Sequence, residues 1–227
     1  MDQMKADVLG GFVVLDDYMA DDLSVVNSAR VSFGKQSDTM SEADVKLIHF
    51  LMRERHGTPF EHNSFRFHVK APIFVAREWF RHRIGSFNEL SGRYTELPDE
   101  WYKPELHAVR QQVGKPGAYT FSPMDPETAG DVVKVIDESV ASMFRTYNYL
   151  LERGVAKELA RTVIPVGAMT EFWWTVNARA LMNFLSLRVA PTAQYEIRQY
   201  ANEIERMFGE VMPTTHTAWL GNGKVAP

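Results

Sequence analysis

The segment Phe65–Phe80, with the sequence FRFHVKAPIFVAREWF, changes from one structural pattern to another and thereby decides the class of fold. Apolar and polar residues alternate from Phe65 to Val69, which predicts a half-buried strand. Pro72 suits the first turn of a helix, because its fixed backbone angle is already helical, and this helix is expected to continue through Phe80. A strand that passes directly into a helix, with no regular βαβ repeat around it, favours an α+β fold.

The rest of the chain is expected to continue this mixture of elements. Strands are predicted at 11–15 and 171–176. Helices are predicted from Asp21 or Asp22 through Ala29, from the capping box Ser41–Asp44 to a stop at His56, and over 127–153, 155–164, 177–188 and 195–208. The stretch from Leu97 to Pro126 holds five of the eleven prolines and is predicted to be a long, lid-like surface excursion. There is no internal repeat, so residues 1–227 are predicted to form a single domain.

Composition limits the classes of protein to which the chain can belong. It has 227 residues, no cysteine and a formal net charge of -4. The absence of cysteine excludes disulfides, thiolate metal sites and a cysteine nucleophile. The negative net charge argues against a nucleic-acid partner, since such domains usually carry a basic excess. Neither a signal peptide nor a run of ~18 apolar residues is present, which predicts a cytoplasmic protein without a membrane partner.

The segment Arg81–Tyr94, RHRIGSFNELSGRY, directly follows the predicted helix and concentrates polar side chains in a stretch with neither a helical nor a strand period. Arginine side chains donate parallel hydrogen bonds to phosphate, and serine hydroxyls and loop amides can complete an anion site. There is no G-x-G-x-x-G or P-loop sequence, so a nucleotide would have to be held in this other way. The alternative is a solvated loop with a surface ion pair such as Arg83 with Glu89.

This segment matches every fixed position of R-H-R-x-x-S-x-N-x-x-S-x-R-Y, and the chain thereby resembles the flavin-dependent thymidylate synthase (ThyX) family. The resemblance continues in order along most of the chain between Asp21 and Phe208. It includes the segments 56–62, 67–77, 174–179 and 187–188.

The resemblance implies an antiparallel-type sheet within the α+β fold and a homotetramer with active sites at subunit interfaces. It also implies FAD as cofactor, NADPH as reductant, and methylenetetrahydrofolate as donor of the carbon that converts dUMP to dTMP. Classical thymidylate synthases attack the pyrimidine with a cysteine, which this chain lacks. Hydride delivery from a reduced flavin needs no protein nucleophile, so composition and motif agree.

By resemblance, two sets of residues bind the ligands. The flavin set is Thr58, Arg81, His82, Arg83, Glu89, Asn177, Arg179 and Asn183. The dUMP set is Glu78, Trp79, Phe80, Arg81, Glu89, Leu90, Ser91, Gly92, Arg93, Arg161 and Arg188, of which the segment 89–93 is expected to come from a neighbouring subunit.

Three residues are predicted to act in catalysis. Arg188 is the first, because a fixed cation beside the uracil ring would stabilise negative charge; the alternative is a cation that only stabilises the end of its helix. Ser91 is expected to position the substrate by hydrogen bonding, since no His-Asp relay adjoins it. His56 is expected to orient flavin or substrate.

Some of these residues also admit other interpretations. His56, His62 and His68 recur every six residues, but the spacing matches no zinc motif, so no metal is predicted. The aromatic run Phe172–Trp174 is interpreted as core rather than as a base-stacking platform. A flavin- or nucleotide-binding module without turnover and an RNA-binding protein are the alternative functions.

Two positions depart from the usual family pattern. Glu78 stands where glutamine is frequent, and Thr192 stands where many members have histidine. A carboxylate at Glu78 beside a substrate phosphate needs a neutralising cation, for which Arg77 or Arg81 is expected.

Overall fold

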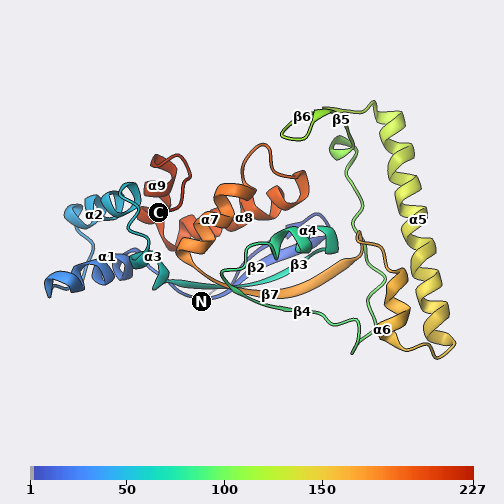
Figure 1. Cartoon of the computed structure of the whole chain (residues 1–227), viewed down its shortest axis with the longest axis horizontal. Helices are drawn as coiled ribbons and strands as arrows, with labels where there is room; N and C mark the ends of the chain where they lie inside the picture. The colour runs from blue at the N-terminus through green and yellow to red at the C-terminus, as the bar shows by residue number, and fades with distance from the viewer. Residues whose placement is uncertain (1–2) are drawn as a thin grey trace.

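The strand predicted at 65–69 is β3, Ser64–Pro72, the central strand of a five-stranded sheet in the computed structural model, which describes residues 3–227 (Figure 1). The strand order is β1-β2-β3-β7-β4, and every neighbouring pair is antiparallel. The other strands are β1 Met4–Val8, β2 Gly11–Met19, β4 Ser86–Glu89 and β7 Met169–Asn177. The α+β class and the antiparallel sheet are therefore confirmed.

Three helices cover one face of this sheet: α4 Ile73–Trp79, α7 Ala178–Arg188 and α8 Tyr195–Val211 (Figure 1). Phe65, Phe67 and Val69 of β3 lie beneath them with no exposed surface. Each buried aromatic side chain contributes about 2–3 kcal/mol through removal of apolar area from water. The helical face of the sheet is thus the main hydrophobic core.

The opposite face of the sheet carries polar side chains such as Arg66 and Lys70 beside apolar ones such as Phe12, and it corrects one prediction. Phe172 and Trp174 are buried as expected, but Trp173 is 39% exposed, because successive side chains of a strand point to opposite faces. Its ring stacks on His68 of β3, with ring centroids 4.6 Å apart and planes 2° apart. His68 also lies 2.6 Å from the Glu171 carboxylate. Trp173 is therefore a surface residue.

A group of helices closes one end of the sheet: α1 Asp22–Arg30, α2 Glu42–Arg53, α3 Thr58–Glu61 and α9 Pro213–Gly221, with a 3-10 turn at Val31–Phe33 (Figure 1). The capping box is confirmed, since the Ser41 hydroxyl accepts from the Asp44 amide and the Ser41 amide donates to the Asp44 carboxylate at 2.9 Å. The predictions missed α3, where only a loop was expected, and α9.

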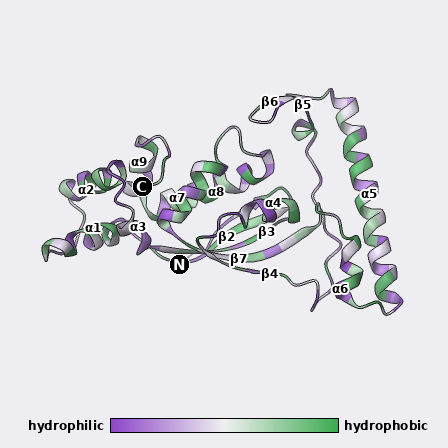
Figure 2. Cartoon of the chain, in the orientation of Figure 1, coloured by the Kyte–Doolittle hydropathy of each residue, from purple (hydrophilic) through white to green (hydrophobic). Residues whose placement is uncertain are grey.

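The long helix α5, Pro126–Glu152, stands away from the sheet at the other end, beside α6, Lys157–Ala160 (Figure 1). Apolar and polar residues are mixed along α5 (Figure 2), as expected for a helix with one apolar stripe. Phe144 and Tyr147 of α5 form a second, smaller core with Trp101, whose ring stacks on Phe144 at 5.4 Å. The helix predicted at 155–164 is shorter, because a 3-10 turn, Arg161–Val163, follows α6.

The predicted surface excursion does run over the surface, but it is not without secondary structure. It contains a 3-10 turn, Leu106–Ala108, and a hairpin of β5, Arg110–Lys115, and β6, Ala118–Pro123. Nearly every residue of the hairpin is exposed, and the prolines around it favoured a loop, although Tyr119 and Phe121 of β6 alternate with polar residues. Within residues 3–227, no helix combines the length and apolar character needed to cross a bilayer.

Asp22 ties α9 to α1. Asp21 caps α1 by accepting from the Ser24 amide, whereas the buried carboxylate of Asp22 accepts from the amides of Thr214 and Thr215, both at 2.8 Å, and from the Thr215 hydroxyl at 2.6 Å. Asp22 therefore supplies acceptors to the first turn of a helix distant in sequence.

We expect Asp22→Ala to lower the free energy of unfolding by about 2–4 kcal/mol, because it leaves three donors at the start of α9 without an acceptor. Urea denaturation measures this change. Asp7→Ala is the control, since the Asp7 side chain is 84% exposed, and it should change stability by less than about 0.5 kcal/mol. Equal effects of the two substitutions would show that Asp22 does not hold α9.

Candidate active site

The loop that follows α4 returns the chain to the sheet and places its basic residues. The amide of His82 donates to the Trp79 carbonyl at 3.0 Å, which turns the chain at the end of the helix. The chain then enters β4, whose pairing with β7 was not predicted. Gly85 permits this approach, because an added Cβ would lie 2.9 Å from the Thr175 carbonyl oxygen and the Trp174 indole nitrogen. The loop is thus held tightly on the sheet.

A cavity of about 730 Å³ opens between this loop and α7. Most of the predicted flavin residues line it, and they come from segments far apart in the sequence. The lining residues are Glu61, Arg81, His82, Arg83, Ile84, Asn177, Arg179, Ala180, Asn183, Leu187, Arg188, Ala226 and Pro227. The structure therefore brings together six of the eight predicted flavin residues, with Arg188 beside them.

Arg188 lies at the end of α7 and is held by two partners. Its Nε donates to Nε2 of His82 at 3.0 Å, and its Nη1 is paired with the carboxylate of Glu78. The cation that neutralises Glu78 is therefore Arg188, not Arg77 or Arg81 as predicted. The second carboxylate oxygen of Glu78, Oε2, is buried and has no hydrogen-bond partner among residues 3–227.

His82 is kept neutral by its surroundings. Burial disfavours the protonated ring, and the adjacent Arg188 guanidinium adds repulsion, so the pKa of His82 is lowered from 6.5 to about 4. A neutral imidazole has one ring nitrogen free to accept, which is the role that Nε2 has toward Arg188. His82 thus orients Arg188 without adding charge to the cavity.

The other cations of the cavity differ in whether they are paired. In the part of the chain that the structure describes, neither Arg81 nor Arg83 has a carboxylate within 4.0 Å, whereas Arg179 pairs with Glu61 at 2.6 Å. The alternative pairing of Arg83 with Glu89 is absent among these residues, since Glu89 accepts from the Thr170 hydroxyl at 2.7 Å. Unpaired arginines in a cavity favour an anionic ligand.

His56 and Thr58 line a second cavity, of about 540 Å³. Its walls come from α1, α2 and α3 and from the 3-10 turn Val31–Phe33, and they include Arg30, Ser32 and Phe33. Gly57, between His56 and Thr58, lies against Arg179, which lines the larger cavity: an added Cβ would lie 2.4 Å from the guanidinium carbon of Arg179. The absence of a side chain at Gly57 thus leaves room for Arg179 beside the segment that carries His56 and Thr58.

The predicted dUMP residues after Glu89 lie elsewhere in the chain's own fold. Leu90, Ser91, Gly92 and Arg93 line neither cavity. Gly92 adjoins Arg161, whose Cδ would be 3.2 Å from an added Cβ, and Arg93 lies 3.3 Å from the Glu158 carboxylate. The structure thus brings these residues to Arg161 but not to Arg188.

Two further predicted residues have side chains in or against the core. Trp79 is fully buried, with its ring 4.9 Å from that of Phe184, and Phe80 packs against Phe87 and Phe172 at 4.8 and 5.0 Å. Trp79 can therefore offer a ligand only its backbone groups, whereas the ring of Phe80 is half-buried.

Sequence reasoning missed the contributions of Glu61, Ala226 and Pro227 to the larger cavity. Glu61 lies within a segment that carries the family resemblance, but nothing in the sequence marks Ala226 or Pro227. Among residues 3–227, no three His, Asp or Glu side chains are grouped so as to hold a metal ion.

Comparison with known proteins identifies the family. Residues 14–214 match the sequence model of Thy1, thymidylate synthase complementing protein. A flavin-dependent thymidylate synthase from Thermosipho africanus is 51% identical over 210 residues, which cover 92% of this chain and 91% of the relative. One from Thermotoga neapolitana is 50% identical over 218 residues, or 96% and 94% of the two chains.

Solved structures agree with the sequence relatives. The UMP/dUMP methylase PolB from Streptomyces cacaoi, bound with 5-Br dUMP, superimposes with a TM-score of 0.89 at 40% identity, over 96% of this chain and 97% of that one. The chain therefore belongs to the Thy1 family. It is an enzyme of the flavin-dependent thymidylate synthase type.

The depressed pKa of His82 predicts a loss of stability in acid. Between pH 6.5 and about 4 the unfolded chain binds a proton at this residue that the folded chain does not, so the free energy of unfolding falls as the pH falls through this range. We expect His82→Gln, whose amide oxygen can still accept from Arg188, to lose less stability over this range. Urea midpoints measured from pH 8 to pH 4 test this, and profiles that stay parallel below pH 6.5 would contradict it.

Proposed function

We propose that the chain methylates dUMP to dTMP with FAD as its flavin, NADPH as reductant and methylenetetrahydrofolate as one-carbon donor. The observation that carries this proposal is the cavity in which Arg188 lies beside Arg81, Arg83 and Arg179. It combines cations for phosphates with the amides of Asn177 and Asn183, in a chain of the Thy1 family.

The hydrogen-bond donors that line the larger cavity fit an elongated, doubly phosphorylated cofactor such as FAD. The two cavities offer separate sites for its two ends, and Gly57 leaves room for Arg179 between the segment of His56 and Thr58 and the larger cavity. We assign Thr58, Arg81, His82, Arg83, Asn177, Arg179 and Asn183 to this ligand. Reduced flavin supplies the hydride, and NADPH supplies the reducing equivalents.

Arg188 is the proposed catalytic cation. His82 and Glu78 hold its guanidinium in one orientation, which supports a role in stabilising negative charge on the pyrimidine without prior rearrangement. His56, at the second cavity, is assigned to orientation of flavin or substrate. The chain has no cysteine, so no thiolate of its own can attack the ring.

We further propose that the active site is shared between subunits of a homotetramer. Leu90–Arg93 and Arg161 lie outside the cavity that holds Arg188, although the resemblance assigns all of them to dUMP. A neighbouring subunit would supply the missing set, with Ser91 positioning the substrate and Arg93 and Arg161 binding its phosphate. Each subunit would be one domain acting in the cytoplasm.

The purified protein tests the proposed function directly. We expect a yellow protein whose flavin absorbance is bleached by NADPH under anaerobic conditions and recovers faster once dUMP and methylenetetrahydrofolate are added. Chromatography of the nucleotides should then show dTMP. UMP is tested beside dUMP, because PolB is described as acting on both. Colourless protein that takes up no FAD would refute the proposal.

Arg188→Ala is expected to lower turnover by about 10²–10³-fold, as removal of one preorganised donor does in other enzymes. The flavin should remain bound, because the other cations of the cavity are unchanged. Arg188→Lys is the matched variant: it keeps the charge but cannot reach both Glu78 and His82, so we expect intermediate turnover. Loss of flavin from Arg188→Ala would assign the residue to cofactor binding instead.

A further inference from the structure

We propose that residues 222–227, here called the strap, form a wall of the flavin cavity and that Lys224 is a positioning residue which, through the strap, holds Arg179 in place for the cofactor. This inference rests on the proposed flavin site. It concerns a segment to which the family resemblance assigns no role.

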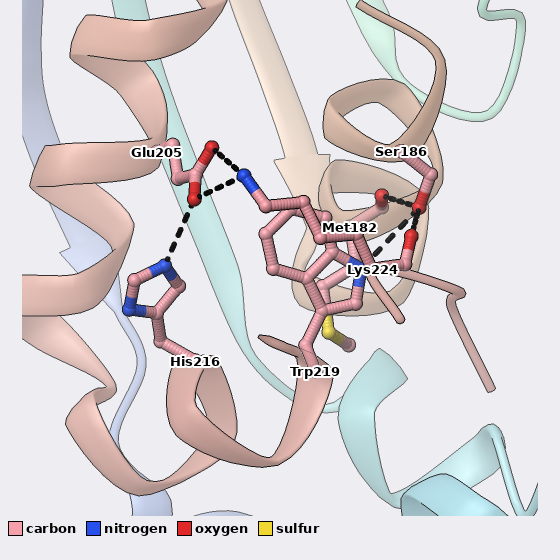
Figure 3. Close-up of polar contacts among 6 residues, drawn as sticks. All are labelled: Met182, Ser186, Glu205, His216, Trp219 and Lys224. Carbon is pink, nitrogen blue, oxygen red and sulfur yellow. Dashed lines mark hydrogen bonds and ion pairs between the residues drawn. The ribbon is translucent and has the colours of Figure 1, made fainter. Parts of the chain in front are cut away.

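Lys224 anchors the strap to α8. Its ammonium lies 2.8 and 2.9 Å from the two carboxylate oxygens of Glu205, and His216 lies 3.3 Å from the same carboxylate (Figure 3). The Glu205 side chain is only 16% exposed and that of Lys224 is 40% exposed, so the ion pair is shielded from water on the Glu205 side. Shielding makes the anchor stronger than an exposed ion pair.

The backbone of the strap is fastened to α7. The hydroxyl of Ser186 lies within hydrogen-bonding reach of the carbonyl oxygens of both Met182 and Lys224, and it accepts from the Trp219 indole at 3.3 Å (Figure 3). A hydroxyl has one proton, so it donates to one of these two carbonyls at a time. Side chain and backbone of Lys224 thus hold the strap from two helices.

The backbone of Lys224 is strained, which indicates that these contacts determine its conformation. Its φ is 59°, in the left-handed region, and the preceding Gly223 has a φ of 69°. A residue with a Cβ adopts this region at a cost and keeps it where surrounding contacts require it. The strained turn redirects the chain from α9 toward the cavity.

The tip of the strap reaches Arg179. The backbone oxygen of Pro227 accepts a hydrogen bond from Nε of Arg179 at 2.8 Å. The carboxylate of Glu61 accepts one from Nη1 at 2.6 Å. Ala226 and Pro227 also line the cavity that contains Arg81 and Arg188. A guanidinium has five N–H donors, so three remain for a ligand after these two contacts.

These contacts indicate that the strap supports the cavity from the side and does not occupy the space of the cofactor. Pro227 is buried and Ala226 packs against the main core, so the tip belongs to the folded structure. It occupies one donor of Arg179 and fixes the plane of the others. A side chain ordered before binding loses less conformational freedom when the ligand arrives, which strengthens binding.

The test measures the flavin dissociation constant of the full chain, from the fluorescence of flavin released on dilution of the loaded protein. We expect Lys224→Met to weaken binding by about 3- to 10-fold, the effect of freeing one ordered side chain. Lys224→Arg should restore binding, because it can still pair with Glu205. Glu205→Gln, which weakens the anchor from the other side, should show a smaller loss.

Two comparisons separate positioning from a general loss of structure. Arg206→Met is the matched control, since Arg206 on α8 pairs with Glu203 and Glu210 outside the cavity lining, and flavin binding should not change. In an Arg179→Ala background, Lys224→Met should cause no further loss, because the residue through which Lys224 acts is gone.

Unchanged or tighter flavin binding by Lys224→Met and Glu205→Gln would overturn the inference, and so would a full additional loss in the Arg179→Ala background. In these cases wild-type protein still binds flavin, so the proposed function stands. A wild-type protein that binds no flavin would refute the proposed function and the inference with it.

Discussion

The antiparallel pairing of β3 with β7 sets the position of the groups that line the larger cavity. The two strands pair along their full lengths, from Ser64 opposite Asn177 to Pro72 opposite Met169. Each strand passes directly into a helix on the same face of the sheet, β3 into α4 and β7 into α7. Because the strands are antiparallel, α7 brings Arg188 at its end back to the loop that follows α4, where it meets His82.

The electrostatics of the site follow from the contact between Arg188 and His82. Burial keeps His82 neutral, so Glu78 is the group that balances the charge of Arg188, while Arg81 and Arg83 stay unpaired within residues 3–227. The site therefore carries a net excess of positive charge, although the whole chain has a formal charge of -4. Local charge, rather than net charge, decides what such a cavity attracts.

Much of the fold could be predicted from local patterns. The alternation of 65–69, the capping box at Ser41 and the apolar stripe of α5 each depend on neighbouring residues, and all three elements formed as expected. The strand β4 was missed because it is only four residues long, and the hairpin β5–β6 was missed because it lies in the proline-rich stretch that favoured a loop. The exposure of Trp173 was missed because the aromatic run was interpreted as one unit rather than by strand face.

By itself the sequence determined the family and most of the residues around the larger cavity, because the Arg81–Tyr94 motif is a contiguous pattern of residue types. Only the tertiary structure decided which of them meet. It paired Glu78 with Arg188 rather than with a neighbour in sequence, placed His56 and Thr58 in a separate cavity, and brought Pro227 to Arg179. Contacts between residues more than a hundred positions apart, such as Glu78 and Arg188, depend on how strands pair and helices pack, and no local pattern records that geometry.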